Sequence, residues 1–192
     1  MNLANRLTVA RFFLTLLFVA VLSVPWRFAA TSAFVLFLAA SVTDYFDGAI
    51  ARRYGLVSDF GKLMDPLVDK ILTAAAFICL VEWRAIPAWV AAAIISREFL
   101  ITGLRLLAAS KGRVLPAERL GKHKTGWQIA TIVFFLALLA AREVSGASAR
   151  EVAWLAFAKN IIGPALIACA LALTLYSGFG YLWRHRELIE AR

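Results

Sequence analysis

Residues 44–69 read DYFDGAIARRYGLVSDFGKLMDPLVD, a polar stretch in a chain that is otherwise mostly apolar. It contains two closely spaced pairs of aspartates, Asp44 with Asp47 and Asp65 with Asp69. Long apolar runs precede and follow the stretch, so these carboxylates stand at the edges of predicted membrane helices. A carboxylate in such a position is energetically costly, and a functional role is the default interpretation.

The composition predicts an all-α integral membrane protein. The chain has 192 residues and is 62% hydrophobic, whereas soluble domains are nearer about half apolar. A spanning helix needs about 20 mostly apolar residues. The sequence therefore predicts a single membrane domain over residues 1–192, with six transmembrane helices at about 8–24, 28–50, 63–81, 86–109, 126–141 and 152–183. A polar, amphipathic segment, MNLANRLTVAR, opens the chain, and we expect the long sixth run to begin as a surface segment before Gly163-Pro164.

The distribution of positive charge predicts the orientation. The formal net charge is +9, and in a membrane protein such an excess indicates cytoplasmic loops and anionic lipid headgroups, not nucleic acid. If the N-terminus is inside, most Lys and Arg residues fall in inner segments. The outer segments carry Arg27, Arg84, Arg142 and Arg150, with Lys159 in or near the last helix. The aspartate-rich stretch is therefore predicted to face the cytoplasm.

Helical spacing can bring the four aspartates together. At 100° per residue, Asp44 and Asp47 share one stripe of the second helix, and Asp65 and Asp69 share one stripe of the third. Converging carboxylates repel one another unless cations lie among them, and hard oxygen ligands suit Mg²⁺ or Mn²⁺. Four of them suit two divalent cations about 4 Å apart, which can clamp a pyrophosphate. The alternative is that these aspartates are interfacial and pair with nearby basic residues such as Arg52.

The spacing also carries a family resemblance. The pattern Asp44-x2-Asp47-Gly48-x2-Ala51-Arg52-x8-Gly61-x3-Asp65-x3-Asp69 resembles the signature of the CDP-alcohol phosphotransferase family at every fixed position. Three further segments resemble its phosphatidylglycerophosphate synthase branch: Asn5-x-Leu7-Thr8-x2-Arg11, Arg97-Glu98-Phe99 with Gly103-Leu104-Arg105, and Gly121-Lys122-x-Lys124-Thr125. The resemblance covers most of the first 130 residues, and the family's six-helix membrane fold agrees with the six predicted spans.

The resemblance implies a reaction and a set of site residues. Members transfer a phosphatidyl group from CDP-diacylglycerol to an alcohol and release CMP. By similarity, Asp44, Asp47 and Asp65 bind the metals, while Asp69 completes the metal site and is the general base for the attacking hydroxyl. The residues expected to contact the CDP-diacylglycerol donor are Gly48, Arg52 and Ser58, with Asn5 and Thr8 assisting from the first helix.

The acceptor is expected to be glycerol 3-phosphate, whose phosphate calls for basic ligands. The residues assigned to that phosphate are Arg105, Arg113, Lys122 and Lys124. The alternative for each is an ordinary inner-face charge against anionic lipid. Sister enzymes that use inositol phosphate, serine or phosphatidylglycerol remain an alternative. Arg97 and Glu98 stand in mid-span, where they either form a structural pair or line the cavity floor.

Two further expectations concern the whole protein. The resemblance implies a homodimer in a bacterial-type inner membrane, with the site facing the cytoplasm. A cation- or proton-coupled transporter is an alternative from a different class. It predicts carboxylates near mid-bilayer with a path to both faces, whereas here the carboxylates cluster on the predicted inner side.

Overall fold

The computed structural model describes residues 3–54, 59–110, 112, 119–144 and 149–186. Within those ranges, the side chains of 3–7, 44–54, 59–66, 69, 119–122 and 149–152 are not described. The described residues are helical apart from short connections, with no strand among them. The elements are α1 (Leu3–Ser23), α2 (Ala29–Tyr54), α3 (Asp59–Glu82), α4 (Ala88–Ser110), α5 (Arg119–Val144), α6 (Ala149–Phe157), the π-helical turn η1 (Ala158–Ile162) and α7 (Gly163–Arg184).

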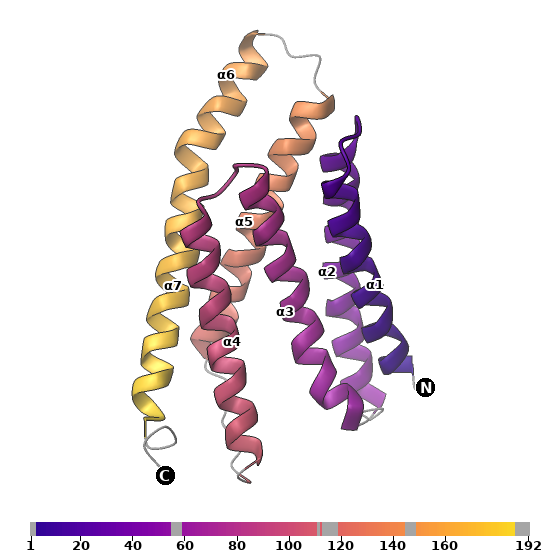
Figure 1. Cartoon of the computed structure of the whole chain (residues 1–192), viewed down its shortest axis with the longest axis vertical. Coiled ribbons are helices and arrows are strands. Elements are labelled where there is room, and N and C mark those ends of the chain that lie inside the picture. The colour runs from indigo at the N-terminus through magenta and orange to yellow at the C-terminus, as the bar shows by residue number, and fades with distance from the viewer. Residues whose placement is uncertain (1–2, 55–58, 111, 113–118, 145–148, 187–192) are drawn as a thin grey trace.

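The long helices run up and down in one bundle (Figure 1). Helix α1 packs against α2 and α3, α5 packs against α2 and α7, and α4 packs against α7 and α3. The end of α2, the start of α3, the end of α4 and the start of α5 lie at the same end of the bundle as the first residues of α1 and the last residues of α7 (Figure 1). The parts of α2 and α3 that carry the aspartates and the facing ends of α4 and α5 therefore belong to one end of the molecule.

A core of aromatic and aliphatic side chains holds the bundle together. Phe18 of α1 and Phe37 of α2 are fully buried, with ring centroids 6.0 Å apart. Phe77 of α3 and Phe135 of α5 extend the same cluster. Many large apolar side chains point outward instead, among them Phe13, Val35, Ile78, Leu175 and Phe179. A surface this rich in exposed apolar groups is suited to lipid and not to water.

The sixth predicted helix is continuous and contains a distortion. Helices α6 and α7 are joined by the π-helical turn η1, directly before Gly163-Pro164, where the sequence predicted that a surface segment would end. Pro164 stands in the first turn of α7, where a missing N–H costs little. Gly163 allows close packing, because a Cβ there would lie 2.9 Å from Cζ of Phe135.

Helix boundaries differ from the predicted spans most clearly near the aspartates. Helix α3 begins at Asp59, four residues before the predicted start, so Pro66 lies in the interior of the helix. The segment MNLANRLTVAR is not separate from the first span, because α1 is one helix from Leu3 to Ser23. Within the described residues, His123–Val144 and Ala153–Arg184 are long and apolar enough to cross a membrane, and Thr8–Ser23 and Ala29–Thr43 are shorter apolar helices.

At the opposite end of the bundle, one carboxylate ties α5 to the start of α2. Glu143 accepts hydrogen bonds from the backbone N–H groups of Ala30 at 2.7 Å and Thr31 at 2.8 Å. The Thr31 hydroxyl donates to the same carboxylate at 2.8 Å. The first N–H groups of a helix have no partner within the helix, so a carboxylate here satisfies them and complements the helix dipole.

Candidate active site

The aspartates lie on two consecutive antiparallel helices. Asp44 and Asp47 are in the last turns of α2, and Asp65 and Asp69 are in the first turns of α3. At 1.5 Å per residue, Asp44 and Asp69 are each about 15 Å from the connection between these helices, and Asp47 and Asp65 are each about 10 Å from it. Their side chains lie outside the described residues, so their convergence stays a prediction.

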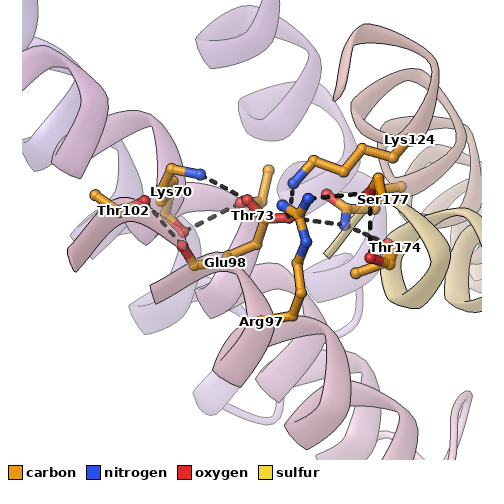
Figure 2. Close-up of polar contacts among 9 residues, drawn as sticks. Lys70, Thr73, Arg97, Glu98, Thr102, Lys124, Thr174 and Ser177 are labelled. Carbon is orange, nitrogen blue, oxygen red and sulfur yellow. Dashed lines mark hydrogen bonds and ion pairs between the residues drawn. The ribbon is translucent and has the colours of Figure 1, made fainter. Parts of the chain in front are cut away.

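A buried polar cluster occupies the neighbouring part of the bundle, centred on Glu98 of α4 (Figure 2). The Lys70 ammonium of α3 donates to Oε2 of Glu98 at 2.6 Å. Oε1 of the same carboxylate pairs with Lys124 of α5 and with Nη1 of Arg97 at 3.2 Å. Gln128 of α5 also donates to Oε1, at 3.4 Å. One carboxylate therefore joins α3, α4 and α5.

The same cluster extends to α7. Nε2 of Gln128 donates to the Thr174 hydroxyl at 2.9 Å, and Nη2 of Arg97 donates to the Ser177 hydroxyl at 3.0 Å (Figure 2). The Arg97 side chain passes directly over Gly178, where a Cβ would lie 2.8 Å from its Cγ. Arg97 and Glu98 therefore form an ion pair that also belongs to a wider network.

The cluster has an excess of positive charge. Lys70, Arg97 and Lys124 face one carboxylate, Glu98, which leaves a formal charge of +2 among these four described residues. Lys124 and Glu98 are 5% and 8% exposed, so water screens this charge little. A buried positive charge is costly unless an anionic group lies close to it, and Glu98 supplies that group for Lys124.

The other described basic candidate lies nearer the end of α4. Arg105 is exposed, and its Nε donates to the Tyr181 hydroxyl of α7 at 3.3 Å. Its guanidinium carbon lies 5.8 Å from the centroid of the Tyr181 ring. Tyr181 is buried and thus fixes one side of Arg105 while the rest of the guanidinium stays accessible.

Of the remaining predicted site residues, the structure describes some side chains and not others. Thr8 is buried on α1, one turn before the buried Arg11. Ser58 and Arg113 lie outside the described residues. The side chains that are likewise outside the description, although their helices are placed, are those of Asn5, Asp44, Asp47, Gly48, Arg52, Asp65, Asp69 and Lys122. Among the side chains that are described, no group of three or more His, Cys, Asp or Glu could hold a metal ion.

Residues 1–176 match the CDP-alcohol phosphatidyltransferase family. The chain belongs to this family. It is therefore an enzyme of the CDP-alcohol phosphatidyltransferase class, a transferase of phospholipid biosynthesis, as its motif predicted. Its membrane-capable helices and its membership in a family of membrane enzymes together indicate an integral membrane protein.

Several relatives have names that specify a reaction. The chain is 43% identical to the CDP-diacylglycerol–glycerol-3-phosphate 3-phosphatidyltransferase of Bacillus subtilis over 143 residues, which are 68% of this chain and 74% of the relative. It is 34% identical to the protein of the same name from Rickettsia typhi over 180 residues, 94% of each chain. It is also 34% identical to a probable phosphatidylglycerophosphate synthase of Mycobacterium tuberculosis over 186 residues, 95% of this chain and 81% of the relative.

Sequence reasoning missed several members of the polar cluster of this transferase, among them two on α3 and α5. Lys70 directly follows Asp69, and Gln128 stands one turn after Lys124, but neither was singled out. A signal for both existed, since polar and ionisable groups within a predicted span mark functional positions by default. For Glu98 and Arg97 the sequence left two interpretations open, and the structure shows their pairing.

Proposed function

We propose that this transferase moves the phosphatidyl group of CDP-diacylglycerol to glycerol 3-phosphate, giving phosphatidylglycerophosphate and CMP. The reaction is named in the relatives to which the chain is 34% to 43% identical, one of them matched over 94% of both chains. The observation that carries the choice of acceptor is the cluster of Lys70, Arg97, Lys124 and Glu98, of which Lys124 and Glu98 are buried. Its cationic groups are of the kind that binds a phosphate monoester, which carries a charge of about −1.5 to −2 near pH 7.

The donor set of the aspartates fits divalent cations. Asp44 and Asp47 on α2 and Asp65 and Asp69 on α3 occur at matching depths in the bundle, and carboxylate oxygens are the ligands preferred by Mg²⁺ and Mn²⁺. Two such cations, when bound, would neutralise the diphosphate of the donor and the charge that develops during transfer. All four aspartates are proposed ligands.

The chain's own groups position the reactants. Asp69 is proposed to accept the proton of the acceptor hydroxyl, whose oxygen then bonds to the phosphorus next to the diacylglycerol as the bond to CMP breaks. Arg52 would pair with the diphosphate, and Gly48 leaves room for the nucleotide. The other proposed contacts to the donor are Ser58, Asn5 and Thr8.

The acceptor phosphate is proposed to lie against basic groups on α4 and α5 and the segment between them. Lys124 and Arg105 are the described members of this set, and Arg113 and Lys122 complete it. Arg can bind phosphate in a bidentate way while Lys acts as a compact charge. Placing the phosphate here would direct the hydroxyl at the other end of glycerol 3-phosphate toward the aspartates of α2 and α3.

The proposed setting is a bundle of six spans in a bacterial-type inner membrane, working as a homodimer. Both ends of the described chain lie at the end of the bundle that carries the aspartates (Figure 1). The basic residues of the predicted inner segments support a cytoplasmic position for that end.

Release of CMP tests the proposal. Purified protein in detergent is given CDP-diacylglycerol, Mg²⁺ and one alcohol at a time: glycerol 3-phosphate, inositol phosphate, serine or phosphatidylglycerol. We expect CMP with glycerol 3-phosphate and a lipid product that carries a second phosphate. CMP release with a different alcohol alone would keep the family reaction and refute the proposed acceptor.

A further inference from the structure

The carboxylate of Glu98 has an unusual number of cationic partners for a buried group. Among the described residues, three cations reach it from three helices: Lys70 at 2.6 Å, Arg97 at 3.2 Å and Lys124. The two carboxylate oxygens of Glu98 bind different cations. Oε2 accepts a hydrogen bond from Lys70 of α3. Oε1 accepts hydrogen bonds from Lys124 of α5 and from Arg97 of α4.

The two lysines connect Glu98 to both halves of the proposed site. Lys70 directly follows Asp69 on α3, so fixing its ammonium limits how α3 can rotate and slide. Lys124 is the buried lysine assigned to the acceptor phosphate. Glu98 thus lies between the helix that carries Asp65 and Asp69 and the helix that carries a phosphate ligand.

Stability alone is a weak explanation for such a cluster. Buried ion pairs often contribute no more stability than apolar side chains of the same volume, because desolvating the charges offsets their attraction. A lysine side chain has large rotamer entropy, which it loses when its ammonium is held. If the lysine is ordered during folding, substrate binding does not bear the entropic cost of ordering it, and the site is preorganised.

We propose that Glu98 is a positioning residue of the transferase. It holds the Lys124 ammonium where the acceptor phosphate arrives, and through Lys70 it fixes α3, with its aspartates, relative to α5. It acts through these lysines and does not touch the reacting atoms. The inference rests on the proposed function, since it names the residue that organises the acceptor side of that site.

The variant Glu98→Asp tests this role without removing the charge. The shorter side chain withdraws the carboxylate by roughly one methylene, so the two lysines can no longer both reach it in the same place. We expect kcat/KM for glycerol 3-phosphate to fall about tenfold to a hundredfold, mostly through a higher KM, because small misplacements are costly. KM for CDP-diacylglycerol should rise less than KM for the acceptor, because α1 and α2 are proposed to supply the other contacts to the donor.

Glu143→Asp is the matched control. Glu143 is also a carboxylate that joins helices, at the opposite end of the bundle. Its shortening should lower the thermal midpoint and leave both KM values unchanged. A second variant, Glu98→Asp combined with Lys70→Arg, extends the cation toward the withdrawn carboxylate and should recover part of the lost kcat/KM.

The results separate this inference from the proposed function. If the wild type releases CMP with another alcohol alone, the proposed acceptor is refuted, and the same KM comparison with that alcohol still tests Glu98. If Glu98→Asp keeps the wild-type KM for the acceptor, or loses activity only in parallel with its thermal midpoint, the positioning role is refuted. An equal rise of KM in Glu143→Asp would refute it as well.

Discussion

Gly178 of α7 lies against the side chain of Arg97 of α4, so that a Cβ at position 178 would lie 2.8 Å from Cγ of Arg97 and 2.9 Å from its Nε. This contact lets α7 support the arginine that pairs with Glu98 at 3.2 Å. Gly178→Ala should therefore displace Arg97, because Cγ lies near the backbone of its own helix and has little room to move. We expect a loss of about 1–3 kcal/mol of stability, typical of overpacking, together with lower CMP release.

Gly180 supplies the control for that prediction. It lies on the same helix, two residues further on, with nothing within 4 Å of its Cβ position. Gly180→Ala should keep activity and raise the thermal midpoint slightly, since alanine favours a helix over glycine. Thermal unfolding in detergent and CMP release measure both effects. Equal behaviour of the two variants would show that the close contact at Gly178 has no functional consequence.

The link between Glu143 and the start of α2 predicts a purely structural effect. Glu143→Gln keeps the shape and removes the charge that accepts hydrogen bonds from the N–H groups of Ala30 and Thr31. Hydrogen bonds to a charged group contribute about 1.5–3 kcal/mol each, so the thermal midpoint should fall measurably. Arg142→Gln changes the neighbouring exposed residue and should leave the midpoint in place. A stable Glu143→Gln variant would contradict the importance of this cap.

Much of the fold follows from the sequence. Apolar runs separated by basic or turn-forming segments predicted the helices, because a chain in lipid must satisfy its backbone groups within each helix. Helix ends were less predictable. The start of α3 at Asp59 was missed because the first turns of this helix are polar and do not resemble a membrane span. The π-helical turn at Ala158–Ile162 depends on packing, which the local sequence does not display.

One part of the candidate site could be predicted from the sequence, and another part could not. The aspartates and the family motif depend on local spacing, which a sequence displays directly. The Glu98 cluster depends on tertiary packing, because Lys70, Glu98, Lys124 and Thr174 come from four helices. A charge within a span predicts that a partner exists, but the identity of the partner depends on which helices are neighbours.

Sided labelling tests the proposed orientation. In a background of Cys79→Ala and Cys169→Ala, single cysteines replace Ser110 at the end of α4 or Val144 at the end of α5, two exposed positions at opposite ends of the bundle. A membrane-impermeant maleimide should label Val144→Cys in intact spheroplasts and Ser110→Cys in inverted vesicles. The reverse pattern would place the aspartates on the outer face, against the distribution of positive charge.

Substitution of the aspartates tests their proposed roles. Asp69→Asn removes the group that would accept the proton, and we expect turnover to fall by about 10²–10⁴. Asp59→Asn is the control, because Asp59 lies in the same stretch but outside the family spacing, and it should keep near wild-type turnover. Full turnover in Asp69→Asn would refute its role as the base.

A ligand and a base respond differently to metal concentration, which separates Asp44 from Asp69. Chelation of divalent cations should abolish CMP release from the wild type, and Mg²⁺ or Mn²⁺ should restore it. Asp44→Asn removes one negative oxygen from the proposed metal ligands, so the concentration of Mg²⁺ needed for half-maximal activity should rise. Unchanged metal dependence in Asp44→Asn would contradict its assignment as a ligand. Because Asp69 is proposed to serve both roles, its Asn variant should show a higher metal requirement and a low rate that saturating Mg²⁺ does not recover.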